Sequence, residues 1–142
     1  MQAGISGVKG QGAHSIIMSG SHYDDKDEGD TVWYTGTKAE PGEGMTANTE
    51  LLHDNIKHKT PVRLIRSSNL AAKNKEYAPA DGFRFDGLYD VISHTVLDAK
   101  THYHLFRLER QPGQDPIRSH PPNRRPTTQD IVMFQKHQAL SR

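Results

Sequence analysis

The stretch AGISGVKGQGAHSIIMSGSHYDDKDEGDTVWYTG, residues 3–36, carries the pattern from which the fold is predicted. Up to residue 12 it has a glycine at every second or third position, which is typical of a loop. Residues 13–19 and 31–35 are rich in apolar, aromatic and β-branched side chains, which favour strands. The segment between these runs is polar and acidic. We therefore predict two strands that are joined by a solvated acidic loop.

Beyond this stretch, short β-prone runs alternate with long loops, and one amphipathic helix is predicted over residues 48–57. Twelve glycines and eight prolines among 142 residues agree with a turn-rich architecture. The fold class predicted is mainly β with flanking helices (α+β), in a barrel-like arrangement. Further strands are expected at residues 61–66, 87–96 and 102–110.

We expect one domain over residues 1–118, followed by a basic, proline-rich tail over residues 119–142. Proline and arginine are already frequent from residue 112 onward, so this end of the chain is expected to be flexible. A short helix near residues 130–140 is compatible with the sequence.

Composition excludes several classes of function. The chain has no cysteine, which excludes disulfides, thiolate zinc sites and cysteine nucleophiles. No apolar run approaches about 18 residues, so we expect a soluble, intracellular protein with no membrane partner. The net charge of +1 does not diagnose a nucleic-acid partner, but basic side chains gather in residues 57–84 and acidic ones in residues 24–30. This distribution of charge suits phosphate contacts around a site with a carboxylate, and the alternative is that both charged segments are solvated surface.

Known catalytic and metal motifs do not match. A calcium loop starting at Asp25 would have Asp30 at its glycine position and Gly36 in place of the final glutamate. Nine histidines include no HExxH, and His102 and His104 share one face of a predicted strand without a clear third ligand. We therefore predict no catalytic residue, no metal and no cofactor.

The stretch quoted above resembles the central signature of SRA (SET- and RING-associated) or YDG domains, which has an AGI-x-G segment, a GA-x-S strand, a DD loop and a YTG strand end. TPVRLIRSSN, residues 60–69, is similar to the family's PVRVVR strand. EYAPADGFRFDGLYDV, residues 76–91, is similar to its YAP-to-YDG segment, with Phe85-Asp86-Gly87 in place of YDG. The resemblance covers roughly residues 2–117.

This resemblance implies a twisted, saddle-shaped β barrel with flanking helices, as in ubiquitin-like PHD- and RING-finger proteins and plant histone methyltransferases. The family's first strands would precede residue 3, so we expect a fragment, a truncated gene model or an incomplete barrel. The resemblance also implies a nuclear protein whose partner is double-stranded DNA with a modified cytosine. Other chromatin proteins are further candidate partners.

The residues are suited to holding a cytosine that is flipped out of the duplex. Flipping costs a few kcal/mol, and stacking on planar side chains returns ~1–3 kcal/mol per base. Tyr34 is predicted as one wall, and His22 or, after a one-residue shift, Tyr23 as the other. A carboxylate at position 25 accepts the N4 amino group of cytosine, and a raised pKa would let it donate to N3. The predicted pocket comprises Ser19, Gly20, Ser21, His22, Tyr23, Asp25, Tyr34 and Thr35.

Each of these assignments has a plainer alternative. Tyr34 could be an ordinary core residue and Asp25 a turn residue, while Asp24, Asp27 and Glu28 are expected to be solvated. Gln2 matches the family's intercalating thumb, but the finger loop shrinks to residues 37–49, so no preference for hemimethylated DNA is predicted. The predicted phosphate contacts are Lys9, Lys73, Lys75 and Arg84, with Arg63 and Arg84 alternatively structural.

The leading hypothesis is a non-enzymatic reader of 5-methylcytosine. Burying one methyl group contributes about 0.8 kcal/mol, or roughly a fourfold preference, so a 5-hydroxymethylcytosine reader is an alternative. A second alternative is a chromatin protein-interaction module that has lost base flipping. A third is the recognition part of a modification-dependent nuclease, although no nuclease motif is visible.

Overall fold

The computed structural model describes residues 4–20, 22–118 and 127–140. No helix in these ranges combines the length and apolar character needed to cross a membrane. The elements are β1 (Ile5–Val8), β2 (Gly12–Met18), β3 (Lys26–Asp27), β4 (Thr31–Thr35), α1 (Ala47–His58), β5 (Val62–Ser67), the 3₁₀ helix η1 (Ser68–Ala72), β6 (Phe83–Asp98), β7 (Tyr103–Arg110) and α2 (Thr128–Leu140).

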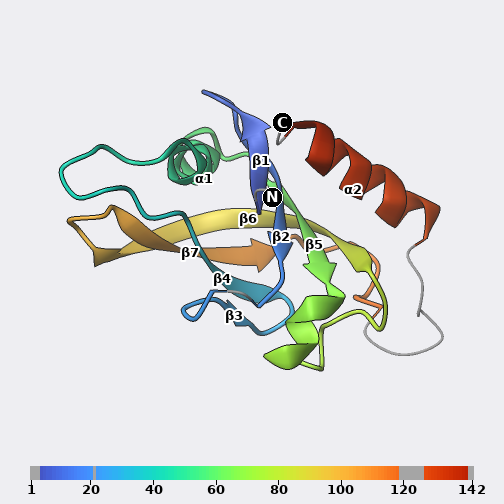
Figure 1. The fold of residues 1–142 in the computed structure, drawn as a ribbon. Coiled ribbons are helices and arrows are strands. Elements are labelled where there is room, and N and C mark those ends of the chain that lie inside the picture. The colour runs from blue at the N-terminus through green and yellow to red at the C-terminus, as the bar shows by residue number, and fades with distance from the viewer. Residues whose placement is uncertain (1–3, 21, 119–126, 141–142) are drawn as a thin grey trace.

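The described strands form one sheet of seven, in the order β1-β2-β5-β6-β7-β4-β3 (Figure 1). Only the pair β2–β5 is parallel, and the other neighbours are antiparallel. This confirms the mainly β fold with flanking helices. The expected barrel closure is not formed, because β1 and β3 remain as the two edges of the described sheet.

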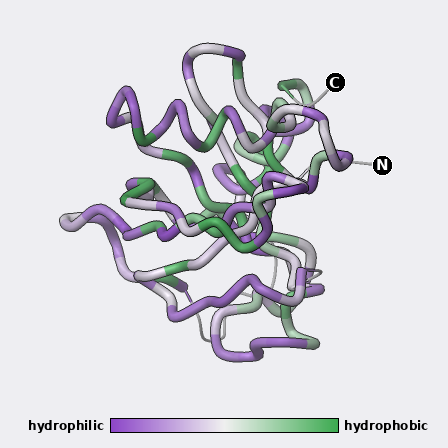
Figure 2. Tube along the Cα trace, turned by 90° about the vertical axis from the view of Figure 1, so that its left-hand side faces the viewer, coloured by the Kyte–Doolittle hydropathy of each residue, from purple (hydrophilic) through white to green (hydrophobic). Residues whose placement is uncertain are grey.

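The core lies where the central strands meet helix α1. Ile16, Leu64 and Phe106 are fully buried on three different strands, and Leu52 of α1 packs against the same core. Figure 2 shows hydrophobic segments crossing the middle of the molecule, while much of the periphery is hydrophilic. The core fixes β2, β4 and β5 relative to one another, and the acidic loop between β2 and β4 is held from both ends.

The prediction that residues 1–12 are a loop is wrong for residues 5–8, which form β1 against β2. Pairing covers the edge of β2 and buries Ile5. The strand contains Gly7 for a steric reason, because a Cβ there would lie 2.3 Å from the carbonyl oxygen of Gly12. Glycine therefore marks a close approach of two strands here, which the sequence pattern alone does not separate from a turn.

Helix α2 packs on the sheet in the region where only a flexible tail with a short helix was expected. The ring of His137 is fully buried, and its Nδ1 lies 2.7 Å from Ser15 Oγ and 3.1 Å from Ser6 Oγ. Asp130, at the start of the helix, accepts hydrogen bonds from the backbone amides of Phe85 and Thr127. These contacts tie α2 to β1, β2 and β6 (Figure 1).

Candidate nucleic-acid interface

A buried network of charges holds the acidic loop against the sheet. Arg66 on β5 donates to both carboxylate oxygens of Asp27, at 2.8 and 2.7 Å, and to Asp86 Oδ2 at 2.7 Å. All three side chains are at most 1% exposed. Burial alone would lower the pKa of Arg66, but its hydrogen bond to Asp27 and the nearby acids raise that pKa, so it stays charged. The expectation that Asp27 is solvated is wrong, because Asp27 is the loop's anchor.

Arg84 belongs to the same network and is not placed to bind phosphate. It is 2% exposed, donates to both oxygens of Asp86, and also donates to the carbonyl oxygens of Tyr77 and Arg118. The prediction of Arg84 as a phosphate contact is therefore wrong, and its structural alternative holds. Asp86 is the acid of the YDG-like block, and its position between two buried arginines gives that residue a physical role.

Asp25 is buried at the other end of the loop. Its Oδ1 accepts hydrogen bonds from the backbone amide and the hydroxyl of Thr35, each at 2.8 Å. Within the described ranges its Oδ2 has no hydrogen-bond partner. Burial raises the pKa of Asp25, although the hydrogen bonds of Thr35 oppose this. A carboxyl group with a raised pKa and one oxygen that no described residue contacts by a hydrogen bond has the properties needed to contact a nucleobase edge.

Tyr34 lies in the packed core. It is 3% exposed, and its hydroxyl donates to the carbonyl oxygens of Gly4 at 3.1 Å and Ile17 at 3.0 Å. Burial raises the pKa of Tyr34, and the charge of Asp25 adds to this effect, so the two side chains are electrostatic neighbours. In this structure, the open stacking face predicted for Tyr34 is absent, because the core already covers its ring.

The two candidates for the opposite wall face solvent. Tyr23 is 94% exposed and His22 is also exposed, so neither ring lies against Tyr34. Gly20 adopts a positive φ of +74°, which turns the chain into this loop at low cost. Ser19 and Thr35 flank the loop, while Ser21 lies outside the described residues. The structure thus brings Asp25 and Thr35 together but leaves the predicted two-ring cage unformed.

A small cavity of about 120 Å³ opens beside the acidic loop. Asp25 and Gly20 reach it from the loop, and Leu70 and Lys73 reach it from η1 and the segment that follows. Among the residues that the structure describes, no aromatic ring lines it. Its lining residues are Met18, Gly20, Asp25, Lys26, Asp27, Leu70, Lys73 and Asn74.

Of the predicted phosphate contacts, Lys73 is occupied by the protein itself. Its ammonium group donates to the carbonyl oxygens of His22, Tyr23 and Asp25, and so holds the loop. Lys9 and Lys75 are exposed. Gln2, the predicted thumb, lies outside the described residues.

Sequence reasoning missed two groups of residues. The Arg66–Asp27–Asp86 network was missed because charge patterns do not distinguish buried from solvated ions. A cluster of His53, His94 and His104 was missed because its members come from three elements, and only the pairing of β6 with β7 brings two of them together. The register of that hairpin is the signal that could have found it.

The structure is thus an open seven-stranded sheet with two packed helices and an acidic loop that is held by the buried side chains of Asp25 and Asp27. The SAD/SRA domain family matches residues 1–114. The chain belongs to this family.

Among curated relatives, the E3 ubiquitin-protein ligase UHRF1 of Rattus norvegicus is 30% identical over 131 residues, which cover 74% of this chain and 17% of that protein. The E3 ubiquitin-protein ligase ORTHRUS 1 of Arabidopsis thaliana is 34% identical over 102 residues, covering 63% of this chain and 16% of that protein. The chain thus spans about one sixth of the length of these relatives.

Three solved structures are similar to the fold. The modification-dependent TagI restriction endonuclease has a TM-score of 0.65 at 30% identity, over 83% of this chain and 48% of that chain. The SRA domain of SUVH5 in complex with methylated CHH DNA has a TM-score of 0.60 at 30% identity, over 82% of this chain and 78% of that chain. The same domain bound to fully hydroxymethylated CG DNA has a TM-score of 0.57 at 27% identity, over 81% of this chain and 78% of that chain.

Proposed function

We propose that this domain binds double-stranded DNA containing 5-methylcytosine by flipping the base toward Asp25, and that it acts in the nucleus as a non-enzymatic reader module. The observation that carries the proposal is the buried Asp25 carboxyl beside a cavity, with Oδ1 fixed by Thr35 and Oδ2 without a partner in the described residues. The DNA complexes of the SUVH5 domain support it through family membership. The ligase and endonuclease activities named for longer relatives are not assigned to this chain.

The chemistry of the site suits cytosine. The free oxygen of Asp25 would accept a hydrogen bond from the N4 amino group, and a protonated carboxyl could instead donate to N3. Because burial raises the pKa of Asp25, the protonated form is more accessible than for an exposed acid. Thymine presents an oxygen at the same edge and would be disfavoured by the ionised carboxylate.

Binding would require the acidic loop to move. A base can stack on Tyr34 only if the core contacts over its ring open, and His22 or Tyr23 would have to turn inward as the second wall. Lys73, which holds three carbonyl groups of the loop, is the group that such a movement would release. Released from these contacts, its ammonium group would be available to a phosphate.

We predict that Asp25→Asn lowers the affinity for a duplex with one 5-methylcytosine by about 10- to 100-fold. Asparagine keeps an oxygen for Thr35 but places an NH₂ donor where the cytosine amino group also donates. Fluorescence anisotropy at fixed salt measures the effect. Thermal unfolding should show no loss of stability, because the substitution removes a buried charge.

Asp24→Asn is the matched control, because Asp24 is the adjacent, exposed acid of the same loop and accepts a hydrogen bond from the Tyr103 hydroxyl. Its affinity should stay within about twofold of the wild type. If Asp25→Asn binds the methylated duplex as tightly as the wild type does, and neither protein distinguishes it from the plain duplex, the proposed role of Asp25 is wrong.

We predict that Lys75→Ala weakens binding to methylated and plain duplexes alike. A phosphate contact carries no sequence information, and removing one should reduce the slope of log K against log salt by about one. Lys57→Ala, an exposed lysine on α1, is the control and should leave the slope unchanged. A change that affects only the methylated duplex would contradict a phosphate role for Lys75.

A second candidate function is a chromatin protein-interaction module that keeps the fold without flipping bases. The covered ring of Tyr34 and the exposed ring of Tyr23 favour it. In that case, the folded domain would bind neither duplex in a salt-dependent manner. A 5-hydroxymethylcytosine reader is distinguished from the main proposal by adding a hydroxymethylated duplex to the same titrations.

A further inference from the structure

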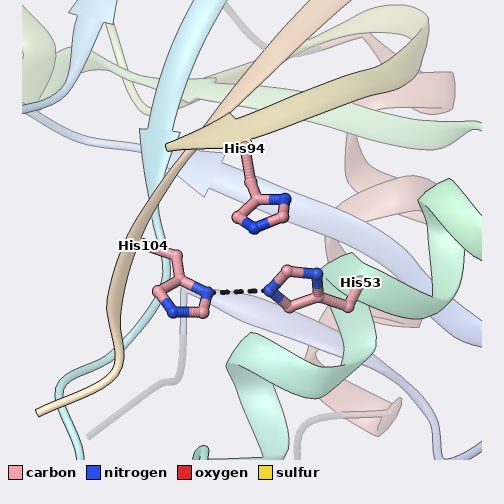
Figure 3. A group of neighbouring side chains, drawn as sticks. All are labelled: His53, His94 and His104. Carbon is pink, nitrogen blue, oxygen red and sulfur yellow. Dashed lines mark hydrogen bonds between the residues drawn. The ribbon is translucent and has the colours of Figure 1, made fainter. Parts of the chain in front are cut away.

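Three histidines from three elements meet at one place, away from the acidic loop. His53 lies on α1, His94 on β6 and His104 on β7, and one ligand nitrogen from each lies within 4.8 Å of the others. His53 Nε2 and His104 Nδ1 are 2.8 Å apart, and His94 sits over this pair (Figure 3). The ring centroid of His94 lies 4.5 Å from that of His53 and 5.3 Å from that of His104.

The fold dictates this meeting. In the β6–β7 hairpin, His94 faces Phe106 and Val96 faces His104, so the two histidines are diagonal neighbours on one face of the sheet. Helix α1 packs on β6 and brings His53 onto the same face, where its ring makes an edge contact with Phe106 at 4.9 Å. The cluster is therefore held by paired backbone and by the core, and does not rest on a loose loop.

Imidazole is a common metal ligand in proteins. Neutral imidazoles bind metals, whereas imidazolium ions do not. His104 is buried, His53 is half-buried and His94 is exposed, so the cluster has a protein side and a solvent side.

We propose that His53, His94 and His104 form a binding site for a divalent transition-metal ion, with Zn²⁺ as the first candidate. Three imidazole nitrogens with an open fourth position are an established zinc ligand set, and the absence of thiolates disfavours softer ions. In a tetrahedral site with Zn–N bonds of about 2.0–2.1 Å, ligand nitrogens lie about 3.3 Å apart. The 2.8 Å pair would open slightly and lose its shared proton, and His94 would close in.

The bound ion would link α1 to the β6–β7 hairpin, and a water molecule or a partner's side chain would take the fourth position. The earlier rejection of a metal site rested on His102 and His104, which lacked a third ligand in the sequence. In the folded chain, His104 is joined by His53 and His94, which come from other segments, and not by His102. This inference is independent of the proposed DNA site.

The test uses the full chain without a polyhistidine tag, stripped with a chelator and titrated with ZnCl₂ by isothermal titration calorimetry. We expect one ion per chain with a micromolar or tighter dissociation constant, and a melting temperature that rises with zinc concentration. His94→Ala should weaken binding at least tenfold. This ligand is exposed, so its loss should not unfold the domain. His53→Gln should weaken binding to a similar degree.

His58→Ala is the matched control, because His58 is an exposed histidine on the same helix. It should bind zinc like the wild type. Co²⁺ in place of Zn²⁺ should give the visible absorption of tetrahedral cobalt in the wild type and the control, and not in His94→Ala. The proposal is overturned if no saturable binding is found at zinc concentrations up to about 100 µM, far above the expected dissociation constant, or if His94→Ala and His53→Gln bind like the control.

Discussion

Arg66→Met is expected to lower the free energy of unfolding by about 3–5 kcal/mol. Methionine preserves much of the side-chain volume but removes the charge that pairs with Asp27 and Asp86, both of which are almost fully buried. The Asp27 carboxylate would then remain in the interior without a cationic partner, and Asp86 would keep only Arg84. Since domains of this size are stable by about 5–15 kcal/mol, the loss should be visible as a large shift in urea-induced unfolding followed by circular dichroism.

Arg107→Met is the matched control, because Arg107 pairs with Glu109 on the surface, where both side chains are more than 40% exposed. Its effect should stay below about 1 kcal/mol, since exposed ion pairs contribute little. If the two variants unfold at similar urea concentrations, then the Arg66 network is hydrated and does not anchor the acidic loop.

Local pattern was sufficient to predict β2, β4, β5 and β7. Their alternating or continuous apolar runs have a single reasonable interpretation, and the structure places strands there with shifts of one or two residues at most. Pattern was insufficient for β1, whose glycines resemble a loop and which becomes a strand through pairing with β2. A short helix was expected near residues 130–140, and α2 lies there, but its packing on the sheet is a long-range contact that local pattern does not predict: His137 is buried beside two serine hydroxyls.

The residues of the candidate site were also predicted only in part from the sequence. Asp25 and Thr35 were predicted as neighbours from the resemblance alone, and two hydrogen bonds join them. Arg84 and Asp27 were misjudged because a charged residue in a sequence is by default assigned to the surface. Only the folded chain shows that Arg84 pairs with Asp86 and that Asp27 pairs with Arg66 in the interior. Arg66 and the Tyr89 hydroxyl both donate to the carbonyl oxygen of Gly29, which holds the acidic loop.

Tyr34→Ala is expected to destabilise the domain by about 3–5 kcal/mol, because it removes a fully buried ring from the core. Tyr34→Phe should cost less, on the order of 1–3 kcal/mol, because it keeps the ring and loses only the hydrogen bonds to Gly4 and Ile17. Thermal and urea unfolding of both variants measure this difference. A small effect of alanine would contradict the core position of this residue.

The same position can be tested for a second role in stacking a flipped base. Tyr34→Phe retains a flat aromatic face, so its affinity for methylated DNA should stay within about twofold of the wild type once the folded fraction is taken into account. Tyr34→Leu keeps an apolar side chain but has no ring, and should lose the stacking contribution of ~1–3 kcal/mol, a weakening of about fivefold to a hundredfold. Equal affinities of the two folded variants would mean that Tyr34 only supports the core. A selective loss in Tyr34→Leu would mean that the acidic loop opens and exposes this ring to the base.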